Sequence, residues 1–259
     1  MMTTTETTLY EIVDGAAWIT LNRPENRNAL SAILVNEVHD HLVAAIENPQ
    51  VRCIVLTGAG PAFCAGADLK SPPGSATSGG RAWSLPDVLN LMLESPKPVI
   101  AAINGAAFAG GLGLVGAADI VVAAEDVQFS FSEVRIGVIP AVISVVCVPK
   151  LGTHHATKLF LTGERFTGRQ AVEMGLVHRA VPADQLRAAV QEEIEMIKLG
   201  APNAVSEAKK LVRRVSKLSI EEGFAETGPW SAKLFRSEEA AEGMAAFREK
   251  RRPAWARGD

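Results

Sequence analysis

Two segments of small residues could bind developing negative charge through backbone N–H groups. One is residues 63–70 (Phe-Cys-Ala-Gly-Ala-Asp-Leu-Lys), and the other is residues 106–114 (Ala-Ala-Phe-Ala-Gly-Gly-Leu-Gly-Leu). Small side chains let the backbone approach a ligand closely, and the first N–H groups of a helix have no intrahelical partner. Two such groups form an oxyanion hole, where the loss of one donor typically costs about 10²–10³ in rate. For either segment alone, close packing of a helix on a strand is the simpler interpretation.

Glu133 is the side chain best suited to move a proton. It lies between Ser132 and Val134 and is followed by residues 135–140 (Arg-Ile-Gly-Val-Ile-Pro). Burial beside apolar groups raises the pKa of a carboxyl toward neutrality, as a general acid or base requires. A salt bridge to Arg135 or to another base is the alternative, and the residues alone favour it.

The glycines at 111, 113 and 116 match a different pattern, the G-x-G-x-x-G of dinucleotide-binding folds. Glu133 follows these glycines at about the sequence separation expected for an acid that binds ribose. In those folds the first glycine follows its strand within a turn, whereas here residues 104–110 come between the predicted strand and the motif. We therefore rank dinucleotide binding below oxyanion binding.

The cysteines and histidines show no pattern typical of a metal or nucleophile site. The three cysteines are odd in number and widely spaced, which argues against a disulfide framework and paired zinc ligands. Cys64 has apolar neighbours and no nearby histidine, so we expect a buried thiol. His39, His41, His154 and His155 lack metalloenzyme spacing, and we expect them at the surface or at an interface. No metal site is predicted.

The composition is typical of a globular protein that binds small molecules or copies of itself. The 259 residues are 47% hydrophobic and 21% charged, with a formal net charge of −3, which disfavours disorder and nucleic-acid binding. Residues 99–118 are uncharged over a length that could span a membrane, but five glycines interrupt them and no aromatic belt is present. The first residues do not resemble a secretory signal. We expect a soluble, cytoplasmic protein without a membrane or nucleic-acid partner.

The elements that would carry these segments alternate between strands and helices. Residues 9–13 and 16–21 predict a β-hairpin, because Asp14-Gly15 supplies the positive φ angles of a tight turn. Apolar residues at helical spacing between 30 and 46 lead into a strand at 51–57. Further elements are predicted at 86–94 (helix) and at 99–103, 119–124 and 127–131 (strands). This repetition predicts parallel pairing and an α/β layered fold, in which loops at the carboxyl ends of strands bind ligands.

The remaining sequence contains one loop and a helical C-terminus. Residues 71–80 are poor in apolar groups and predict a mobile loop, more simply a passive connection than a gating lid. Helical patterns run through 204–215, and residues 219–222 fit a capping box for another helix. We divide the chain into an α/β core at 1–200 and a C-terminal helical region at 201–259, which we expect to pack on a neighbouring subunit.

Several motifs, in order along nearly the whole chain, closely resemble the crotonase (enoyl-CoA hydratase/isomerase) superfamily. They are residues 21–30 (Leu-Asn-Arg-Pro-Glu-Asn-Arg-Asn-Ala-Leu), 63–70, 98–105 (Pro-Val-Ile-Ala-Ala-Ile-Asn-Gly), 109–111, 131–140, 161–166 and 171–177. The resemblance implies a spiral core of repeated ββα units and a C-terminal helical region that builds trimers, often paired into hexamers. It also implies an acyl-coenzyme A thioester as substrate, so coenzyme A is part of the substrate and no separate cofactor is expected.

The same resemblance implies roles for individual residues. The backbone N–H groups of Ala67 and Gly110 would polarise the thioester carbonyl, and Glu133 would move a proton at the α or γ carbon of the substrate. The other residues placed along the substrate are Ala29, Ala65, Asp68, Leu69, Gly111, Gly113 and Pro140, with Arg27, Lys70 and Lys250 as basic helpers. Lys250 either approaches the nucleotide phosphates, often from the next subunit, or is a solvated tail charge. Trp83 either covers the acyl pocket or packs locally, and local packing is the simpler alternative.

One position departs from the hydratase pattern. Hydratases of this superfamily usually hold the attacking water between two carboxylates, and Gly113 stands where the second is expected. Isomerases manage with one acid/base group, and the loss of such a group typically costs about 10²–10⁴ in rate. Residues 140–144 (Pro-Ala-Val-Ile-Ser) also resemble branched-chain, glutaconyl-type hydratases, which tolerate this glycine. We predict an enoyl-CoA hydratase, a lyase of fatty acid metabolism, with a Δ3,Δ2-enoyl-CoA isomerase or a catalytically weak acyl-CoA-binding protein as alternatives.

Overall fold

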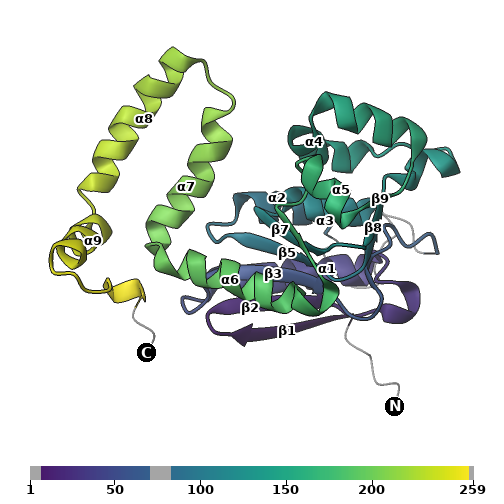
Figure 1. The fold of residues 1–259 in the computed structure, drawn as a ribbon, viewed down its shortest axis with the longest axis horizontal. Coiled ribbons are helices and arrows are strands. Elements are labelled where there is room, and N and C mark those ends of the chain that lie inside the picture. The colour runs from purple at the N-terminus through teal and green to yellow at the C-terminus, as the bar shows by residue number, and fades with distance from the viewer. Residues whose placement is uncertain (1–6, 71–82, 257–259) are drawn as a thin grey trace.

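The larger of two sheets forms the centre of the fold in this computed structural model, which describes residues 7–70 and 83–256. Its strand order is β1-β2-β3-β5-β7-β10 (Figure 1). The strands are β1 (Thr8–Val13), β2 (Ala16–Leu21), β3 (Cys53–Gly58), β5 (Val99–Ile103), β7 (Ile120–Ala124) and β10 (Arg179–Val181). β1 and β2 pair antiparallel, and the other pairs in this sheet are parallel. The predicted hairpin and α/β fold are confirmed, while the predicted loop at 71–80 lies outside the described residues.

A second, smaller sheet lies beside the first, and the sequence-based prediction contains one of its strands, at 127–131, but not the sheet. Its order is β4-β6-β8-β9, and its strands are β4 (Ala62–Cys64), β6 (Ala106–Phe108), β8 (Gln128–Ser130) and β9 (Phe166–Thr167). Residues 63–70 and 106–114 do follow the strands at 53–57 and 99–103, but the expectation that they are loops is wrong at their first residues, which lie in β4 and β6. Strands of three residues are too short to show an alternating pattern. β3, β5 and β7 are thus each followed by a short strand and then by a helical segment, as a ββα repeat requires.

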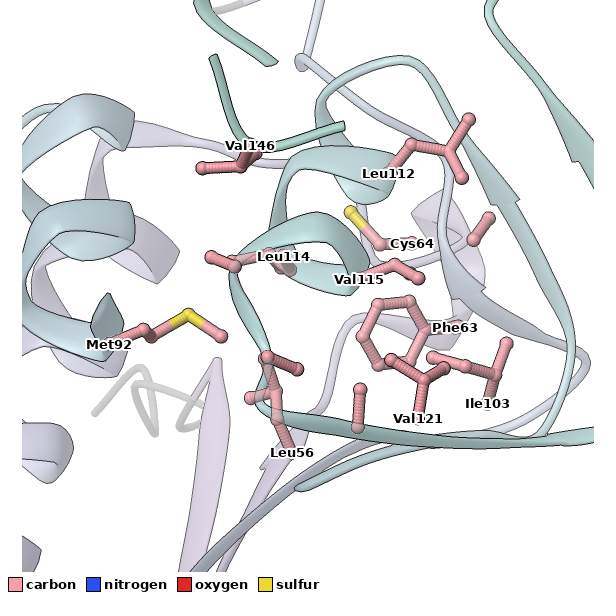
Figure 2. Packing of buried hydrophobic residues seen from close by; sticks show 14 of the residues in the cluster. Leu56, Phe63, Cys64, Met92, Ile103, Leu112, Leu114, Val115, Val121 and Val146 are labelled. Carbon is pink, nitrogen blue, oxygen red and sulfur yellow. The ribbon is translucent and has the colours of Figure 1, made fainter. Parts of the chain in front are cut away.

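Helices pack on both faces of the larger sheet. They are α1 (Ala32–Glu47), α2 (Leu85–Glu94), α3 (Gly110–Ala117), α4 (Ala141–Thr162), α5 (Gly168–Glu173) and α6 (Leu186–Leu199), with the 3₁₀ helices η1 (Pro24–Asn26), η2 (Ser132–Ile136) and η3 (Ala183–Gln185). One face of the sheet packs with α1, α2 and α3, and the other packs with α6. Figure 2 shows Leu112, Leu114 and Val115 of α3 in the first of these cores, near Phe63 and Cys64 of β4. Buried apolar side chains therefore hold α3 in place.

Local sequence determines how the helices begin. The Ser31 hydroxyl accepts a hydrogen bond from the Leu34 N–H at the start of α1, and Ser84 with Asp87 forms a capping box at the start of α2. Such caps satisfy N–H groups that have no intrahelical acceptor. At the start of α3, by contrast, Ala109 provides no side-chain cap. The first N–H groups of α3 are therefore left without a capping side chain.

Three C-terminal helices extend away from both sheets (Figure 1). They are α7 (Pro202–Val215), α8 (Ile220–Phe235) and α9 (Glu238–Arg248), followed by η4 (Ala254–Ala256), and the predicted capping box begins α8. Several of their large apolar side chains are exposed, among them Val212, Ile220, Phe224, Phe235 and Phe247. A mainly apolar groove of about 720 Å³ lies among these helices. The division of the chain after residue 200 stays a prediction.

The uncharged stretch at 99–118 contains β5, β6 and α3 rather than one long helix. None of the helices within the described ranges is long and apolar enough to cross a membrane.

Candidate active site

Three neighbouring strands of the smaller sheet end at one edge. β4, β6 and β8 run parallel in that order. Their carboxyl ends lead into residues 65–68, 109–110 and 132–133. Segments that follow adjacent parallel strands lie side by side, which is where α/β folds bind ligands. The predicted donors Ala67 and Gly110 and the predicted acid Glu133 therefore share this edge.

A backbone bridge directs the N–H of Ala67 away from the neighbouring chain segment. Leu30 pairs with Ala67 in parallel register. The Leu30 N–H donates to Gly66 O at 2.7 Å, and the Asp68 N–H donates to Leu30 O at 3.1 Å. Because the residues flanking Ala67 make both bonds of this bridge, the N–H of Ala67 itself points to the opposite side. Gly110 is close by, since a Cβ added to it would lie 3.7 Å from the Ala67 nitrogen.

The second donor follows a strained residue, Ala109. It has φ 47° and ψ −122°, a conformation that alanine rarely adopts and that costs about 1–3 kcal/mol. The Ala109 N–H donates to Ser130 O at 3.0 Å, which ties the end of β6 to β8. The next residue, Gly110, opens α3, so its N–H has no acceptor within the helix. No residue type marks this strain, and the role of Ala109 is missed by the sequence-based prediction.

Gly66 allows the two donor segments to approach each other. Its φ is +92°, and a Cβ at this position would lie 2.9 Å from Phe108 O and 3.2 Å from the Gly110 nitrogen. A side chain here would push the segments apart and would also strain the backbone. The close approach brings the segments of Ala67 and Gly110 together, and the predicted oxyanion role of their N–H groups stays a prediction.

The buried amide of Asn28 organises a loop that supports the first donor segment. Arg27 and Asn28 both have left-handed backbone, with φ 50° and 55°. Asn28 Oδ1 accepts the Arg23 N–H at 2.8 Å, while its Nδ2 donates to Ala59 O at 3.0 Å and to Ala62 O at 2.8 Å. Asn28 thereby fixes the loop at 23–30 against the start of β4. In the sequence it is an unremarked member of the motif at 21–30.

Asp68 serves the structure of the site rather than its proton chemistry. The Arg23 guanidinium donates to Ala29 O at 2.9 Å and to the Asp68 carboxylate at 3.1 Å. Burial alone would raise the pKa of Asp68, but hydrogen bonds from the Lys70 N–H and from Arg23 hold it below its ordinary value. Asp68 is therefore ionised and paired, and any contact with a ligand would come from its backbone.

Glu133 lies in η2, directly after β8, and this 3₁₀ helix ends at Gly137 with φ 80°. Glu133 Oε2 is buried and has no hydrogen-bond partner within residues 7–70 and 83–256. Burial raises the pKa of Glu133 above its ordinary value, and a bond from its own N–H offsets this only in part. The alternative salt bridge to Arg135 is not formed, since the Arg135 guanidinium lies 3.5 Å from Thr162 O. A half-buried carboxylate with one buried oxygen unpartnered and a raised pKa is typical of a proton-transfer group.

Hydrocarbon fills the position of a second carboxylate. A Cβ added to Gly113 would lie 2.7 Å from Ile143 Cγ2 and 3.3 Å from Leu89 Cδ1. Contacts shorter than 3 Å cannot persist without a shift of the neighbouring atoms, so an acidic side chain does not fit beside Ile143. A second carboxylate at residue 113 would therefore require Ile143 to move, and the catalytic role of Glu133 stays a prediction.

The other glycines of the dinucleotide-like pattern also serve close packing. A Cβ on Gly111 would lie 2.5 Å from Cys64 O, and one on Gly116 would lie 2.8 Å from Cys147 Sγ. These contacts bring α3 against β4 and α4, and they leave no space for a phosphate beside the glycines. The packing explains this glycine pattern without a dinucleotide.

Comparison with known proteins agrees with this geometry. The model of the enoyl-CoA hydratase/isomerase family matches residues 11–258. The chain belongs to this family. It is 35% identical over 249 residues to a carnitinyl-CoA dehydratase of Proteus mirabilis, covering 92% of this chain and 93% of the relative. It is 36% identical over 241 residues to the enoyl-CoA hydratase EchA19 of Mycobacterium tuberculosis, covering 91% of each. An enoyl-CoA hydratase/isomerase from Marinobacter aquaeolei has the same fold, with a TM-score of 0.89 and 32% identity over 98% of this chain and 100% of that one.

The other predicted substrate-binding residues occupy different places in this hydratase/isomerase family member. Half-buried residues next to the donor segments are Ala29, Ala65 and Asp68, and exposed ones are Arg27, Leu69 and Lys70. Pro140 is buried directly before α4. Lys250 follows α9, which lies far from α3 in the same chain (Figure 1). A single chain therefore does not bring Lys250 to the site, and the binding roles of all these residues stay predictions.

The structure also places the side chains that the sequence leaves open. The Trp83 ring stacks on His39 with centroids 3.7 Å apart, and the backbone N–H of Trp83 donates to Asn36 Oδ1 at 2.7 Å, so the local packing of Trp83 is confirmed. The expected surface position of His39 is wrong, because Trp83 covers it and leaves it 8% exposed. Cys64 is buried as expected, and burial raises the pKa of its thiol to about 12, which makes it a poor nucleophile.

Proposed function

We propose that this family member is an enoyl-CoA hydratase, which adds water across the 2,3 double bond of an enoyl-CoA thioester. The observation that carries the proposal is the shared sheet edge, where two backbone N–H groups and the half-buried carboxylate of Glu133, with one oxygen unpartnered among the described residues, follow three neighbouring parallel strands. The names of two relatives, a hydratase and a dehydratase, favour a reaction that gains or loses water.

The proposed reaction uses the two parts of the site in sequence. The N–H groups of Ala67 and Gly110 donate to the thioester carbonyl oxygen, which draws electron density from the double bond and makes carbon 3 electrophilic. The Glu133 carboxylate takes a proton from water while the water oxygen bonds to carbon 3, and the negative charge moves onto the thioester oxygen as an enolate. Glu133 then returns the proton to carbon 2. The product has gained one water, and the carboxylate is regenerated.

The hydrocarbon around Gly113 favours a second candidate, a Δ3,Δ2-enoyl-CoA isomerase. Isomerisation removes a proton from carbon 2 of a 3-enoyl thioester and returns it to carbon 4, so one carboxylate suffices and no water is held. Ile143 lies where a second carboxylate would stand. A third alternative, a weak acyl-CoA-binding protein, would keep the two N–H donors and turn over neither substrate.

We also infer a coenzyme A path along the exposed rim of the donor segments. Arg27 and Lys70 are exposed cations on either side of the bridge between Leu30 and Ala67. Phosphate groups are favoured beside such cations. The acyl part of the substrate would then extend inward, toward Glu133.

A trimer, or a hexamer of two trimers, is the assembly that we propose for the C-terminal helices. Phe247 is 86% exposed and Phe224 is 76% exposed, and the groove among α7, α8 and α9 is mainly apolar. Apolar surfaces of this extent are usually covered by another copy of the chain. Lys250 would then approach the site of a neighbouring copy. Light scattering that gives a monomer mass at micromolar concentration would contradict this assembly.

Substrate panels with product mass as the readout test the proposed function. Straight and branched 2-enoyl-CoA and 3-enoyl-CoA thioesters are incubated with the wild type and with Glu133→Gln. The proposal expects a 2-enoyl substrate to gain one water and the variant to lose about 10²–10⁴ in rate. Isomerisation of the 3-enoyl substrate without gain of water would make the protein an isomerase. Binding without turnover of any substrate would leave acyl-CoA binding as its activity.

A further inference from the structure

One buried lysine of the C-terminal helices reaches back into the α/β core. The Lys209 side chain on α7 is 7% exposed, and its ammonium lies 2.7 Å from Asp119 Oδ2. The same ammonium donates to Met92 O at 2.8 Å and to Lys97 O at 3.2 Å. The three acceptors match the three N–H donors of an ammonium. The cluster is therefore a satisfied structural contact, with no donor of Lys209 left for a ligand.

The acceptors belong to elements that pack against α3 or adjoin it. Met92 lies in the last turn of α2, and Lys97 lies just before β5. Asp119 connects the end of α3 to β7, and it is fixed to β5 because its Oδ2 accepts the Val99 N–H at 2.8 Å while its own N–H donates to Val99 O at 2.8 Å. Lys209 thus joins α7 to α2, to β5 and to the turn after α3.

The short helix α3 can transmit a displacement from one end to the other. It has 8 residues, with Gly110 at its start and Ala118 as its C-cap. A half-buried lysine, Lys150 of α4, donates to Ala118 O at 2.5 Å. Between its ends α3 is packed at contact distance against β4 and α4, and close-packed interiors transmit strain rather than absorb it. A shift at Asp119 is therefore expected to move the N–H of Gly110.

We infer that Lys209 is a positioning residue, which holds α3 and thereby aims the Gly110 N–H at the thioester oxygen. The inference rests on the proposed function, because it requires an oxyanion hole at Ala67 and Gly110. Without the ammonium, Asp119 would keep the Val99 N–H and Lys97 O would keep the Ser95 hydroxyl, but Asp119 would lose its ion pair and all three acceptors would lose the donor that joins them to α7. In this largely buried place, α7, α2 and the end of α3 would then separate or take up water. The geometry of the active site thus depends on how the C-terminal helices are docked.

Lys209→Met tests the inference, because it keeps the hydrocarbon stem and removes all three donors. The matched control is Lys210→Met, since Lys210 is its neighbour on α7 and pairs with Glu207 of the same helix at the surface. The readouts are kcat, KM and the ultraviolet absorption of bound 2,4-hexadienoyl-CoA, a conjugated thioester whose spectrum shifts to the red when its carbonyl is polarised. All are measured well below the unfolding temperature of each variant.

The inference expects Lys209→Met to lose part of the red shift and at least about tenfold in kcat, up to the 10²–10³ of a lost donor. KM is expected to stay within about threefold, since the coenzyme A path is untouched. Lys209→Arg, which keeps a cation for Asp119, should recover part of both signals, and Lys210→Met should match the wild type. A folded Lys209→Met protein with wild-type kcat and red shift would overturn the inference.

Two further outcomes separate this inference from other failures. If Lys209→Met does not fold, Asp119→Asn carries the test, because its amide oxygen still accepts the Val99 N–H while the charge is lost. Asp119→Asn is expected to lose the red shift to the same extent as a folded Lys209→Met protein would. If Lys209→Met, Asp119→Asn and Lys209→Arg all fail to fold, the positioning role is overturned and the role of Lys209 is purely structural. A wild type that binds hexadienoyl-CoA with no red shift would instead contradict the oxyanion hole and the proposed function.

Discussion

The two halves of the site are built differently. The oxyanion half consists of backbone atoms fixed by their neighbours, through the bridge from Leu30, the strain at Ala109 and the close contact at Gly66. The acid half consists of one side chain, Glu133, on a short 3₁₀ helix followed by exposed residues such as Ile139, which is 71% exposed. A function made by backbone depends on packing, whereas a function made by a side chain depends on its identity and solvation. Substitutions in the two halves should therefore fail in different ways.

The largest effect is expected at Glu133. Glu133→Gln removes the acid/base group and leaves its volume unchanged, so kcat should fall by about 10²–10⁴ while KM and folding change little. Steady-state kinetics and thermal unfolding measure both. Glu173→Gln, at an exposed position on α5, is the matched control and should match the wild type. Wild-type kcat in Glu133→Gln would show that the acid half lies elsewhere.

Gly66→Ala should break the oxyanion half. The added Cβ would meet Phe108 O at 2.9 Å and the backbone already has φ +92°, so the donors separate and kcat should fall by about 10²–10³. Stability should fall as well, unlike in Glu133→Gln. Gly223→Ala on α8 is the control, because a Cβ there meets nothing within 4 Å, and alanine favours a helix by about 0.5–1 kcal/mol. Equal kinetics for Gly66→Ala and the wild type would contradict a backbone-made site.

Gly113→Glu asks whether the acid half could accept a second carboxylate. Alone it should lower the free energy of unfolding by about 1–3 kcal/mol, because the new side chain collides with Ile143. Combined with Ile143→Ala, the collision is relieved, and the double variant should be more stable than the sum of the single changes. Urea unfolding of the four proteins measures the coupling. Strict additivity would show that Ile143 does not control this position.

The smallest effect concerns pH. Burial raises the pKa of Glu133 above its ordinary value of 4.5, and the reaction needs the carboxylate, so kcat/KM should fall on the acid side through a pKa above 4.5. The effect on stability has the opposite sign. The folded state disfavours the ionised form of Glu133, so the free energy of unfolding decreases as the pH rises through this pKa. Glu133→Gln should therefore gain slightly in stability relative to the wild type at neutral pH and not at low pH. Identical differences at both pH values would contradict the raised pKa.

The long elements were predictable because their patterns are strong. Asp14-Gly15 specifies the hairpin turn, and the apolar spacing before residue 46 specifies α1. The strands β4 and β6 could not be predicted, since three residues such as 62–64 carry no periodicity. The small residues of both segments do allow close packing of neighbouring backbone, as one of the two interpretations expected. The second sheet, which aligns the two segments, arises only from tertiary pairing.

The candidate site could be located from the sequence only where it depends on residue type. Glu133 and the small-residue segments could be named from the motifs, and their roles stay predictions, whereas the strain at Ala109 and the amide network of Asn28 could not be predicted. Backbone angles and the partners of a buried amide depend on distant segments, which one sequence does not reveal. The burial of His39 also depends on a distant segment. Trp83 lies 44 positions further along the chain, and it covers His39 because the segment before α2 packs on α1.

The separate construction of the two halves is tested most directly by measuring carbonyl polarisation and turnover together in Glu133→Gln and Gly66→Ala. Bound 2,4-hexadienoyl-CoA reports polarisation by its red shift, and a 2-enoyl-CoA substrate reports hydration. Glu133→Gln should keep the red shift and lose turnover, while Gly66→Ala should lose both. A Glu133→Gln protein without the red shift, or a Gly66→Ala protein with the full red shift and wild-type turnover, would contradict a site made of a backbone oxyanion hole and one separate carboxylate.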